Sequence, residues 1–278
     1  MFKKKKPEVL QDNRLQLITD SAPFEYVEAY NTLRTNINFV SVSGNNRKIV
    51  ITSTVRDEGK SSISVNLSIS LAQAGNKVLL IDADMRNPSV GRYMQIKSEN
   101  DMGLSELLTG KAKVGDCLVH TEYGLDVIVG GQIPPNPVEL ISSEGMKELL
   151  NVAAQRYDCV ICDAPPVGII TDAAALSPLC DGVLFVVRHK FASRNHIHSA
   201  IQSLQRVDAK ILGVIMSRYI IPKASEKYYG PRHKYRYGYG YGYGYGYGYG
   251  YGYGYGYGHS HSEKHSKKQK TEETNKGE

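Results

Sequence analysis

The sequence predicts an α/β protein with helices flanking a doubly wound, mostly parallel sheet, followed by a disordered C-terminal tail. Short apolar runs alternate with longer amphipathic stretches up to about residue 219. The apolar runs lack apolar–polar alternation, which is typical of strands buried on both faces of a parallel sheet. The composition then changes sharply to a Tyr-Gly repeat. One folded domain with an appended tail follows from these three observations.

Six apolar runs are expected to be strands: 48–53, 78–83, 125–129, 159–163, 182–187 and 211–216. Six stretches between and before them are expected to be helices: 25–40, 60–75, 103–109, 143–156, 171–179 and 192–207. Strands that alternate with helices indicate βαβ units, whose crossovers should be right-handed.

Three regions follow from composition. Residues 1–22 form a basic N-terminal arm, 23–219 the folded domain and 220–278 the tail. The Tyr-Gly repeat at 237–258 contains eleven tyrosines. Glycine at every second position opposes a regular helix and weakens a strand, so we expect disorder there. A low-complexity adhesive tail or a segment that associates as β-structure remains an alternative.

The formal net charge of +6 is concentrated towards the ends, in Lys3–Lys6 and in residues 223–236. This distribution argues against a nucleic-acid-binding face on the domain. It permits contact between the ends and an anionic membrane surface, although solvated charge runs explain it equally well. No run of apolar residues is long enough to span a membrane, and the basic start lacks the apolar stretch of a signal peptide.

Two of the four cysteines, Cys159 and Cys162, fall in one expected strand. Residues three apart on a strand point to opposite faces, so we interpret them as buried free thiols and not as a redox pair. This is consistent with a reducing cytoplasm.

The segment around Gly59-Lys60-Ser61 matches a P-loop, a glycine-containing loop between a strand and a helix that wraps around phosphates. Lys60 would reach the β- and γ-phosphates, the Ser61 hydroxyl would bind Mg²⁺, and Ser62 would lie near the α-phosphate. Thr54 stands where the first glycine usually does. The residues expected to bind the nucleotide are Thr54, Val55, Arg56, Asp57, Glu58, Gly59, Lys60, Ser61 and Ser62.

Two further motifs place carboxylates at strand ends. LLIDADMRNP ends a strand with Asp82 and Asp84, which are two residues apart and so should both face one bound Mg·ATP, with Arg86 as a candidate for charge compensation. CVICDAPP ends another strand with Asp163, the arrangement of a Walker B motif, which holds a metal ion. Ligands of such folds bind at the carboxyl ends of the strands, where all three motifs should meet.

Residues 25–218 resemble the bacterial tyrosine kinases of capsule and exopolysaccharide biosynthesis, which share their fold with the MinD/ParA branch of P-loop proteins. The resemblance rests on TSTVRDEGKSS, LLIDADMRNP and VICDAPPVG as Walker A, A′ and B motifs, and on GLSELLTG, PPNPVELISS and TDAAALSPLCDGVLFVVR. It implies an ATP- and Mg²⁺-dependent protein-tyrosine kinase. Lys60, Asp82, Asp84 and Asp163 would form its catalytic core, with Asp82 as the base and Ser61, Asp84 and Asp163 as metal ligands.

The resemblance also implies partners. These are a membrane polysaccharide co-polymerase that activates the kinase, a cognate protein-tyrosine phosphatase and further copies of the chain in a ring such as an octamer. The kinase would then lie in the cytoplasm at the inner face of the plasma membrane. The ring-forming helix motif of the family, Glu-Arg-Arg at three-residue spacing, is here Glu28, Asn31 and Arg34. In the P-loop, Arg56-Asp57 replace the family's Pro-Gly.

The tail has the composition of a substrate, because it supplies many phenol groups on a flexible chain. About 60 Å of extended chain separates residue 219 from the repeat, enough to reach a neighbouring active site. The tyrosines expected to be phosphorylated are Tyr228, Tyr229, Tyr235, Tyr237, Tyr239, Tyr241, Tyr243, Tyr245, Tyr247, Tyr249, Tyr251, Tyr253, Tyr255 and Tyr257.

Two other functions remain open at this point. A MinD- or ParA-like ATPase has the same fold, but Val55 occupies the position of its early P-loop lysine. A nucleotide-sensing regulatory module without catalysis would tolerate the altered P-loop, but it would not need Lys60 and all three carboxylates.

Overall fold

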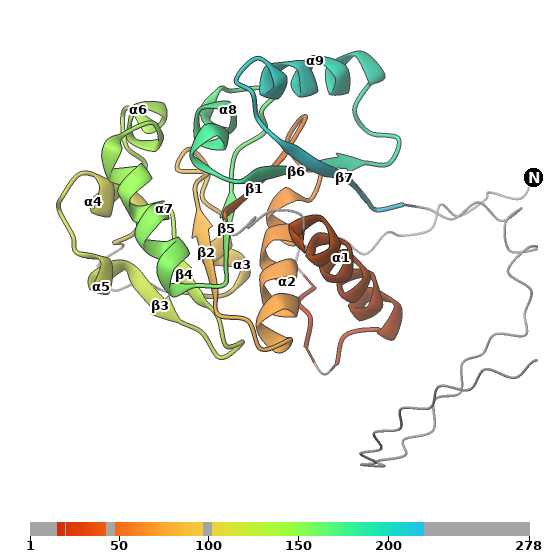
Figure 1. Cartoon of the computed structure of the whole chain (residues 1–278), viewed down its shortest axis with the longest axis horizontal. Helices are drawn as coiled ribbons and strands as arrows, with labels where there is room; N and C mark the ends of the chain where they lie inside the picture. Colours follow the sequence, from red (N-terminus) through yellow and green to blue (C-terminus); the bar gives the residue numbers. More distant parts are fainter. Residues whose placement is uncertain (1–15, 20, 43–47, 97–101, 220–278) are drawn as a thin grey trace, which may run out of the picture. The chain divides into compact units, whose positions relative to one another are not determined.

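A computed structural model describes residues 16–19, 21–42, 48–96 and 102–219. Within this part of the chain one seven-stranded sheet has the order β3-β4-β2-β5-β1-β6-β7. All neighbouring strands are parallel except β3 and β4, which are antiparallel. The predicted doubly wound, mostly parallel sheet is confirmed. The strands, labelled in Figure 1, are β1 (Lys48–Ser53), β2 (Val78–Asp82), β3 (Leu118–His120), β4 (Asp126–Ile128), β5 (Cys159–Asp163), β6 (Gly182–Arg188) and β7 (Ile211–Ser217).

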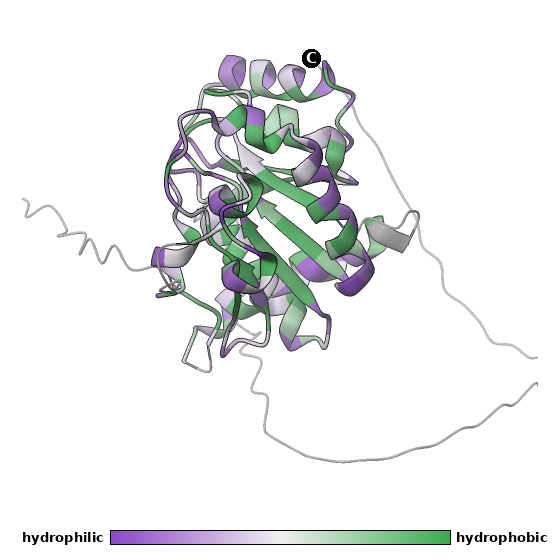
Figure 2. Ribbon diagram, turned by 90° about the vertical axis from the view of Figure 1, so that its left-hand side faces the viewer, coloured by the Kyte–Doolittle hydropathy of each residue, from purple (hydrophilic) through white to green (hydrophobic). Residues whose placement is uncertain are grey.

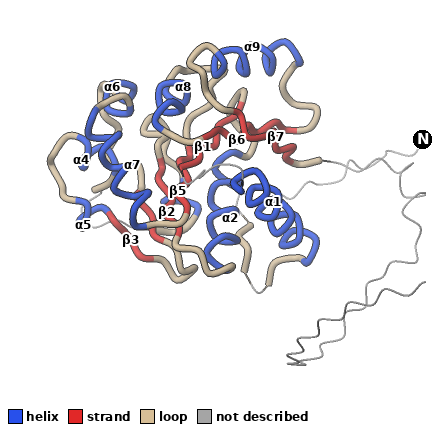
Figure 3. Tube along the Cα trace, viewed as in Figure 1, coloured by secondary structure: helices blue, strands red, loops and turns tan. Residues whose placement is uncertain are grey.

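Helices cover both faces of this sheet, as the blue and red segments of Figure 3 show. The helices are α1 (Phe24–Val42), α2 (Lys60–Gln73), α3 (Val90–Tyr93), α4 (Leu104–Leu108), α5 (Val114–Cys117), α6 (Pro137–Ile141), α7 (Glu144–Arg156), α8 (Asp172–Leu176), the 3₁₀ helix η2 (Ser177–Leu179) and α9 (Arg194–Gln205). Helices α1, α2 and α3 contribute to the core on one face, and α4 to α9 contribute to the core on the other.

Alternate residues of the central strands enter different cores. Ile49 and Ile51 of β1 pack with α1 and α2, whereas Val50 packs with the opposite layer. The strands are therefore apolar on both faces, which Figure 2 shows as a green sheet between helices that carry the polar residues. Cys159 and Cys162 of β5 likewise enter opposite cores as free thiols, so the prediction about them is confirmed.

Helix α2 is largely buried although half of its sequence is polar, because each of its buried polar side chains has a hydrogen-bond partner. Asn66 accepts a hydrogen bond from the backbone N–H of Ile18 and donates to the carbonyl of Gln16, which fastens the chain before α1. Ser68 donates to the carbonyl of Ser64. Burial of these groups is tolerated because they are hydrogen-bonded.

The expectation that every strand is buried on both faces is wrong for β7. This strand lies at the edge of the sheet, and Val214 and Met216 are more than half exposed. Its apolar sequence cannot be distinguished from that of a central strand, because strand order is a property of the whole sheet.

The sequence analysis also missed short elements. Helices α3 and α5 have four residues each and β3 has three, too few to establish a periodicity. Helix α6 begins at Pro137 in a proline-rich stretch, where proline is tolerated at the first helical position. The helix expected at 171–179 is α8 followed by η2, with Pro178 in the second helical segment. The tail and most of the basic arm lie outside the described residues, so the proposed division into arm, domain and tail stays a prediction.

Candidate functional site

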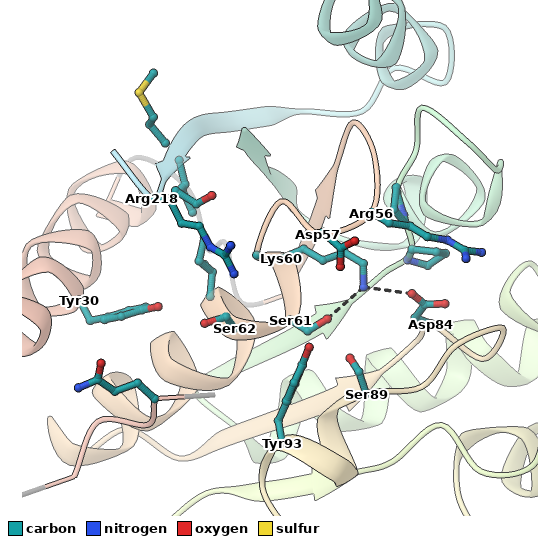
Figure 4. A pocket seen from close by; sticks show the side chains of 18 of the residues that line it. Tyr30, Arg56, Asp57, Lys60, Ser61, Ser62, Asp84, Ser89, Tyr93 and Arg218 are labelled. Carbon is teal, nitrogen blue, oxygen red and sulfur yellow. Dashed lines mark hydrogen bonds and ion pairs between the residues drawn. The ribbon is translucent and has the colours of Figure 1, made fainter. Parts of the chain in front are cut away.

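Three neighbouring strands bring the three predicted motifs together. Strand β5 lies between β1 and β2, and Asp163 at its end is in register with Ile51 of β1 and Asp82 of β2. The loops that follow these strands surround a cavity of about 1010 Å³. Lys60, Ser61, Ser62 and Asp84 line this cavity (Figure 4). The predicted meeting of the motifs at the carboxyl edge of the sheet is confirmed.

The loop after β1 has the backbone shape of an anion-binding P-loop. Gly59 has φ 92° and is the N-cap of α2, so that Lys60 is the first helical residue. Asp57 also lies in the left-handed region, with φ 63°. Asp is one of the few side chains that tolerate this region, so the residue that replaces the family's glycine is compatible with the turn seen here.

Not every residue of this loop faces the cavity. Arg56, Asp57, Gly59, Lys60, Ser61 and Ser62 line it. Thr54 and Glu58 are buried, and Glu58 accepts a hydrogen bond on Oε2 from the backbone N–H of Val55. Its Oε1 accepts from the N–H of Arg188, and its carbonyl accepts from the Ser217 hydroxyl at 2.5 Å. Glu58 thus ties the loop to the ends of β6 and β7.

Lys60 lies at the centre of the charged cluster. Its Nζ is 3.0 Å from Asp84 Oδ2, 3.6 Å from Asp163 Oδ2 and 3.1 Å from the Ser61 hydroxyl. Burial by itself lowers the pKa of Lys60, but the charges of Asp163 and Asp84 outweigh it and the pKa is raised. The lysine therefore keeps its positive charge inside the cavity.

Asp163 is fully buried, and a residue that the sequence analysis missed holds one of its oxygens. The Ser64 hydroxyl, one turn into α2, donates to Oδ1 at 3.0 Å. Oδ2 makes no hydrogen bond within the described residues, and burial raises the pKa of this carboxyl. The residues around this oxygen suit Mg²⁺ bound to phosphates. A buried carboxylate oxygen without a donor can bind the ion, and the neighbouring lysine and helix N-terminus favour the negative charge of the phosphates.

Asp82 does not lie where the spacing predicted. Its Oδ2 accepts hydrogen bonds from the N–H groups of Ser89 and Val90, and it lines a second hollow of about 660 Å³. Asp84, not Asp82, lines the cavity with Lys60. Strand β2 ends at Asp82, so the alternation of a strand does not extend to Asp84. Burial and the charge of Asp163 raise the pKa of Asp82 to about 7.

Arg86 is paired within the protein. Its Nε and a terminal nitrogen contact the two oxygens of Asp172 at 2.8 and 3.1 Å, in a bidentate pair. Asp172, at the start of α8, is fully buried, and the hydrogen bonds that Arg86 donates to it raise the pKa of Arg86. Arg86 lines the cavity from this fixed position. Before the structure, nothing marked Asp172 except its place as an acidic residue in the first turn of a helix.

Glycine brings the loop after β5 close to the P-loop. A Cβ at Gly168 would lie 2.3 Å from the carbonyl oxygen of Thr54. The proline pair before this glycine, Pro165 and Pro166, lines the cavity. The VICDAPPVG segment thus contributes a wall as well as the carboxylate of Asp163.

The three residues of the expected ring motif lie on α1 and contact one another or α2. Asn31 donates to Glu28 at 2.8 Å, and Arg34 donates to the carbonyl and hydroxyl of Ser70 at 2.7 and 3.0 Å. Arg34 therefore stabilises packing within the chain. The tyrosines from Tyr228 onward lie outside the described residues.

Fold and site together define a P-loop nucleotide-binding protein, and the family described as AAA domain matches residues 46–215. Tyrosine-protein kinase YwqD of Bacillus subtilis (strain 168) is 40% identical over 210 residues, which cover 75% of this chain and 88% of that protein. The chain belongs to the bacterial tyrosine-protein kinases and is a protein-tyrosine kinase, as the sequence motifs predicted.

Solved structures agree with this assignment. The kinase domain of Escherichia coli tyrosine kinase ETK is similar with a TM-score of 0.66 and 33% identity, covering 77% of this chain and 80% of that one. The septum site-determining protein MinD of Pyrococcus horikoshii OT3, complexed with Mg-ADP, has a TM-score of 0.54 and 23% identity over 65% of this chain and 76% of that one, and shares the fold alone. Among the described helices, none has the length and apolar content needed to cross a bilayer.

Proposed function

We propose that this kinase uses Mg·ATP to phosphorylate the tyrosines of its own tail in trans and so regulates the polymerisation and export of capsular or extracellular polysaccharide. The observation that carries the proposal is the cluster of Lys60, Asp84 and Asp163 at the N-terminus of α2. The tail supplies a dense set of acceptor tyrosines on the same chain.

The side chains would divide the work by position. The backbone N–H groups of the loop and Lys60 would hold the phosphates, since positioning and charge stabilisation dominate phosphoryl transfer. Ser61, Asp84 and Asp163 would hold Mg²⁺, which when bound neutralises charge on the phosphates. Arg86, kept in place by Asp172, would compensate charge at the rim of the cavity.

Asp82 is our candidate for accepting the proton of the tyrosine hydroxyl. A pKa of about 7 suits a general base at neutral pH. The acceptor would approach through the hollow that Asp82 lines with Pro88, Val129 and Ile133. The walls of this hollow are polar and apolar in about equal measure, and Gly130 and Gly131 leave room along it, which suits an alternating Tyr-Gly chain.

Assembly and location complete the proposal. Copies of the chain would form a ring through α1, with Glu28 and Asn31 at the contact, so that each tail reaches a neighbouring active site. A membrane polysaccharide co-polymerase would activate the kinase with its cytoplasmic segment and hold it at the inner face of the plasma membrane. A cognate phosphatase would reverse the modification.

Two full-length variants test transfer between chains. One carries Lys60→Met with an intact tail, and the other has phenylalanine at every tail tyrosine with an intact cavity. We expect neither to be labelled alone with Mg·ATP and the partner segment, and the Lys60→Met chain to gain phosphotyrosine in the mixture. Mass spectrometry locates the modified residues.

Three results would contradict the proposal. Unmodified tails in the wild-type chain, while ATP is bound or hydrolysed, would remove the tail as substrate. Labelling of wild type without labelling in the mixture would retain the kinase but exclude transfer in trans. If the Lys60→Met chain alone were labelled as strongly as the wild type, the Lys60 cluster would not be the site of phosphoryl transfer.

A further inference from the structure

Strand β7 ends directly above the nucleotide cavity. Ser217, Arg218 and Tyr219, the last described residues, all line the cavity together with Lys60 and Ser62. The strand belongs to the opposite end of the sequence from the P-loop, and no motif in it suggested a role in binding.

The neighbours of Arg218 fix its position on both sides. The Ser217 hydroxyl donates to the carbonyl of Glu58, in the P-loop itself. The ring of Tyr219 packs against His189, with ring centroids 5.0 Å apart. The backbone between these anchors turns in the left-handed region, with φ 48° at Arg218. Arginine is a disfavoured residue for this conformation, and such strain collects at functional sites.

This turn directs the side chain over the cavity. Figure 4 shows the Arg218 guanidinium extending towards the side on which Ser62 and Lys60 lie. Within the described part of the chain the guanidinium makes neither a hydrogen bond nor an ion pair. Arg86, another arginine of this cavity, is by contrast bound to Asp172. Arg218 is therefore a positioned cation with its donors available to a ligand.

We propose that Arg218 is a nucleotide-binding residue that donates hydrogen bonds to a phosphate common to ATP and ADP. The inference rests on the proposed use of ATP at this cavity. Phosphate oxygens suit the fork of guanidinium donors. In Figure 4 Arg218 lies on the side of the cavity where Ser62 is labelled and away from Asp84, and Ser62 is the residue expected near the α-phosphate, so we assign the contact to the α- and β-phosphate side of the loop. Because the tail continues from Tyr219, the same contact would hold the start of the tail when nucleotide is bound.

Equilibrium binding of ATP and of ADP to full-length variants tests the assignment. Arg218→Gly removes the side chain and accepts the left-handed backbone, so it should fold as the wild type does. We expect Arg218→Gly to lower the affinity for both nucleotides by about tenfold to hundredfold, the usual effect of losing a hydrogen bond between charged groups. Arg218→Lys should retain part of the affinity. Arg206→Ala, an exposed arginine at the end of α9, is the control and should bind like the wild type.

Hydrogen exchange provides a second readout that does not depend on catalysis. ADP should slow exchange of the backbone amides of residues 217–219 in the wild type and have a smaller effect in Arg218→Gly. Equal affinity of the wild type and Arg218→Gly for both nucleotides would overturn the proposal. So would a loss confined to ATP, which would place the contact on the γ-phosphate. If the wild type itself bound neither nucleotide, the proposed function would fail first.

Discussion

Lys60 Nζ lies 3.0 Å from Asp84 Oδ2, so the lysine that follows one strand is held by the carboxylate that follows another. Asp163 contacts the same ammonium group from the strand between them. The lysine is thus the positive centre of a cluster that burial would otherwise make strongly unfavourable. The predictions below depend on this arrangement and on the loops around it.

Replacing Lys60 by Met should abolish tail phosphorylation and also destabilise the fold. Loss of the ammonium leaves Asp84 and Asp163 without their shared cation, which should cost about 3 kcal/mol at pH 8. The cost should be smaller at pH 5, because burial raises the pKa of Asp163 and this carboxyl can then bind a proton. Urea unfolding at both pH values measures this, with the exposed Lys111→Met as the control. An equal cost at both pH values would contradict the electrostatic explanation.

Replacing Asp82 by Asn should make stability less sensitive to pH. The folded pKa of Asp82, about 7, lies above its ordinary value of 3.8, so the native state binds this proton more tightly. That contribution is complete below about pH 4 and is lost as the pH rises through 7. An amide cannot ionise, so Tm of the variant relative to wild type should rise between pH 5 and pH 8. Thermal unfolding of both proteins across this pH range measures the difference. A difference in Tm between variant and wild type that stays constant with pH would contradict the raised pKa of Asp82.

Replacing Asp57 by Asn should strengthen nucleotide binding. Asn tolerates the left-handed backbone at this position, while the change removes a negative charge from the wall of the cavity. We expect about a threefold gain in ADP affinity at low ionic strength, shrinking in high salt. Asp208→Asn, which has a similar backbone conformation at the end of α9, should have no effect. A gain that is independent of salt would point to a change in loop shape instead.

Replacing Gly168 by Ala should push the two cavity loops apart. The added methyl group would meet the carbonyl oxygen of Thr54 at 2.3 Å, and backbone atoms cannot yield as a side-chain end can. We expect a loss of about 1–3 kcal/mol in stability and weaker nucleotide binding. Gly115→Ala is the matched control, since nothing lies within 4 Å of its added methyl group. Wild-type affinity in Gly168→Ala would show that the loop after β5 does not shape the site.

The sequence by itself determined the fold class, the order of the central elements and the three motifs of the site. Buried parallel strands have apolar runs, and phosphate binding requires a glycine and a lysine at fixed places at the start of a helix. The strands and the P-loop can therefore both be recognised from short stretches of sequence. The effect of Asp57 in the P-loop could not be judged in this way, because it depends on a backbone angle that only the structure gives.

Only the tertiary structure decided what lies around those motifs. Asp82 and Asp84 line different hollows because strand β2 ends at Asp82 and the backbone N–H groups of Ser89 and Val90 bind the Asp82 carboxylate. Ser64, Asp172 and Arg218 meet the site from a helix interior, another helix and an edge strand. Contacts between residues so far apart in the chain depend on how the helices and strands pack. Periodicity and spacing along the sequence do not predict this packing.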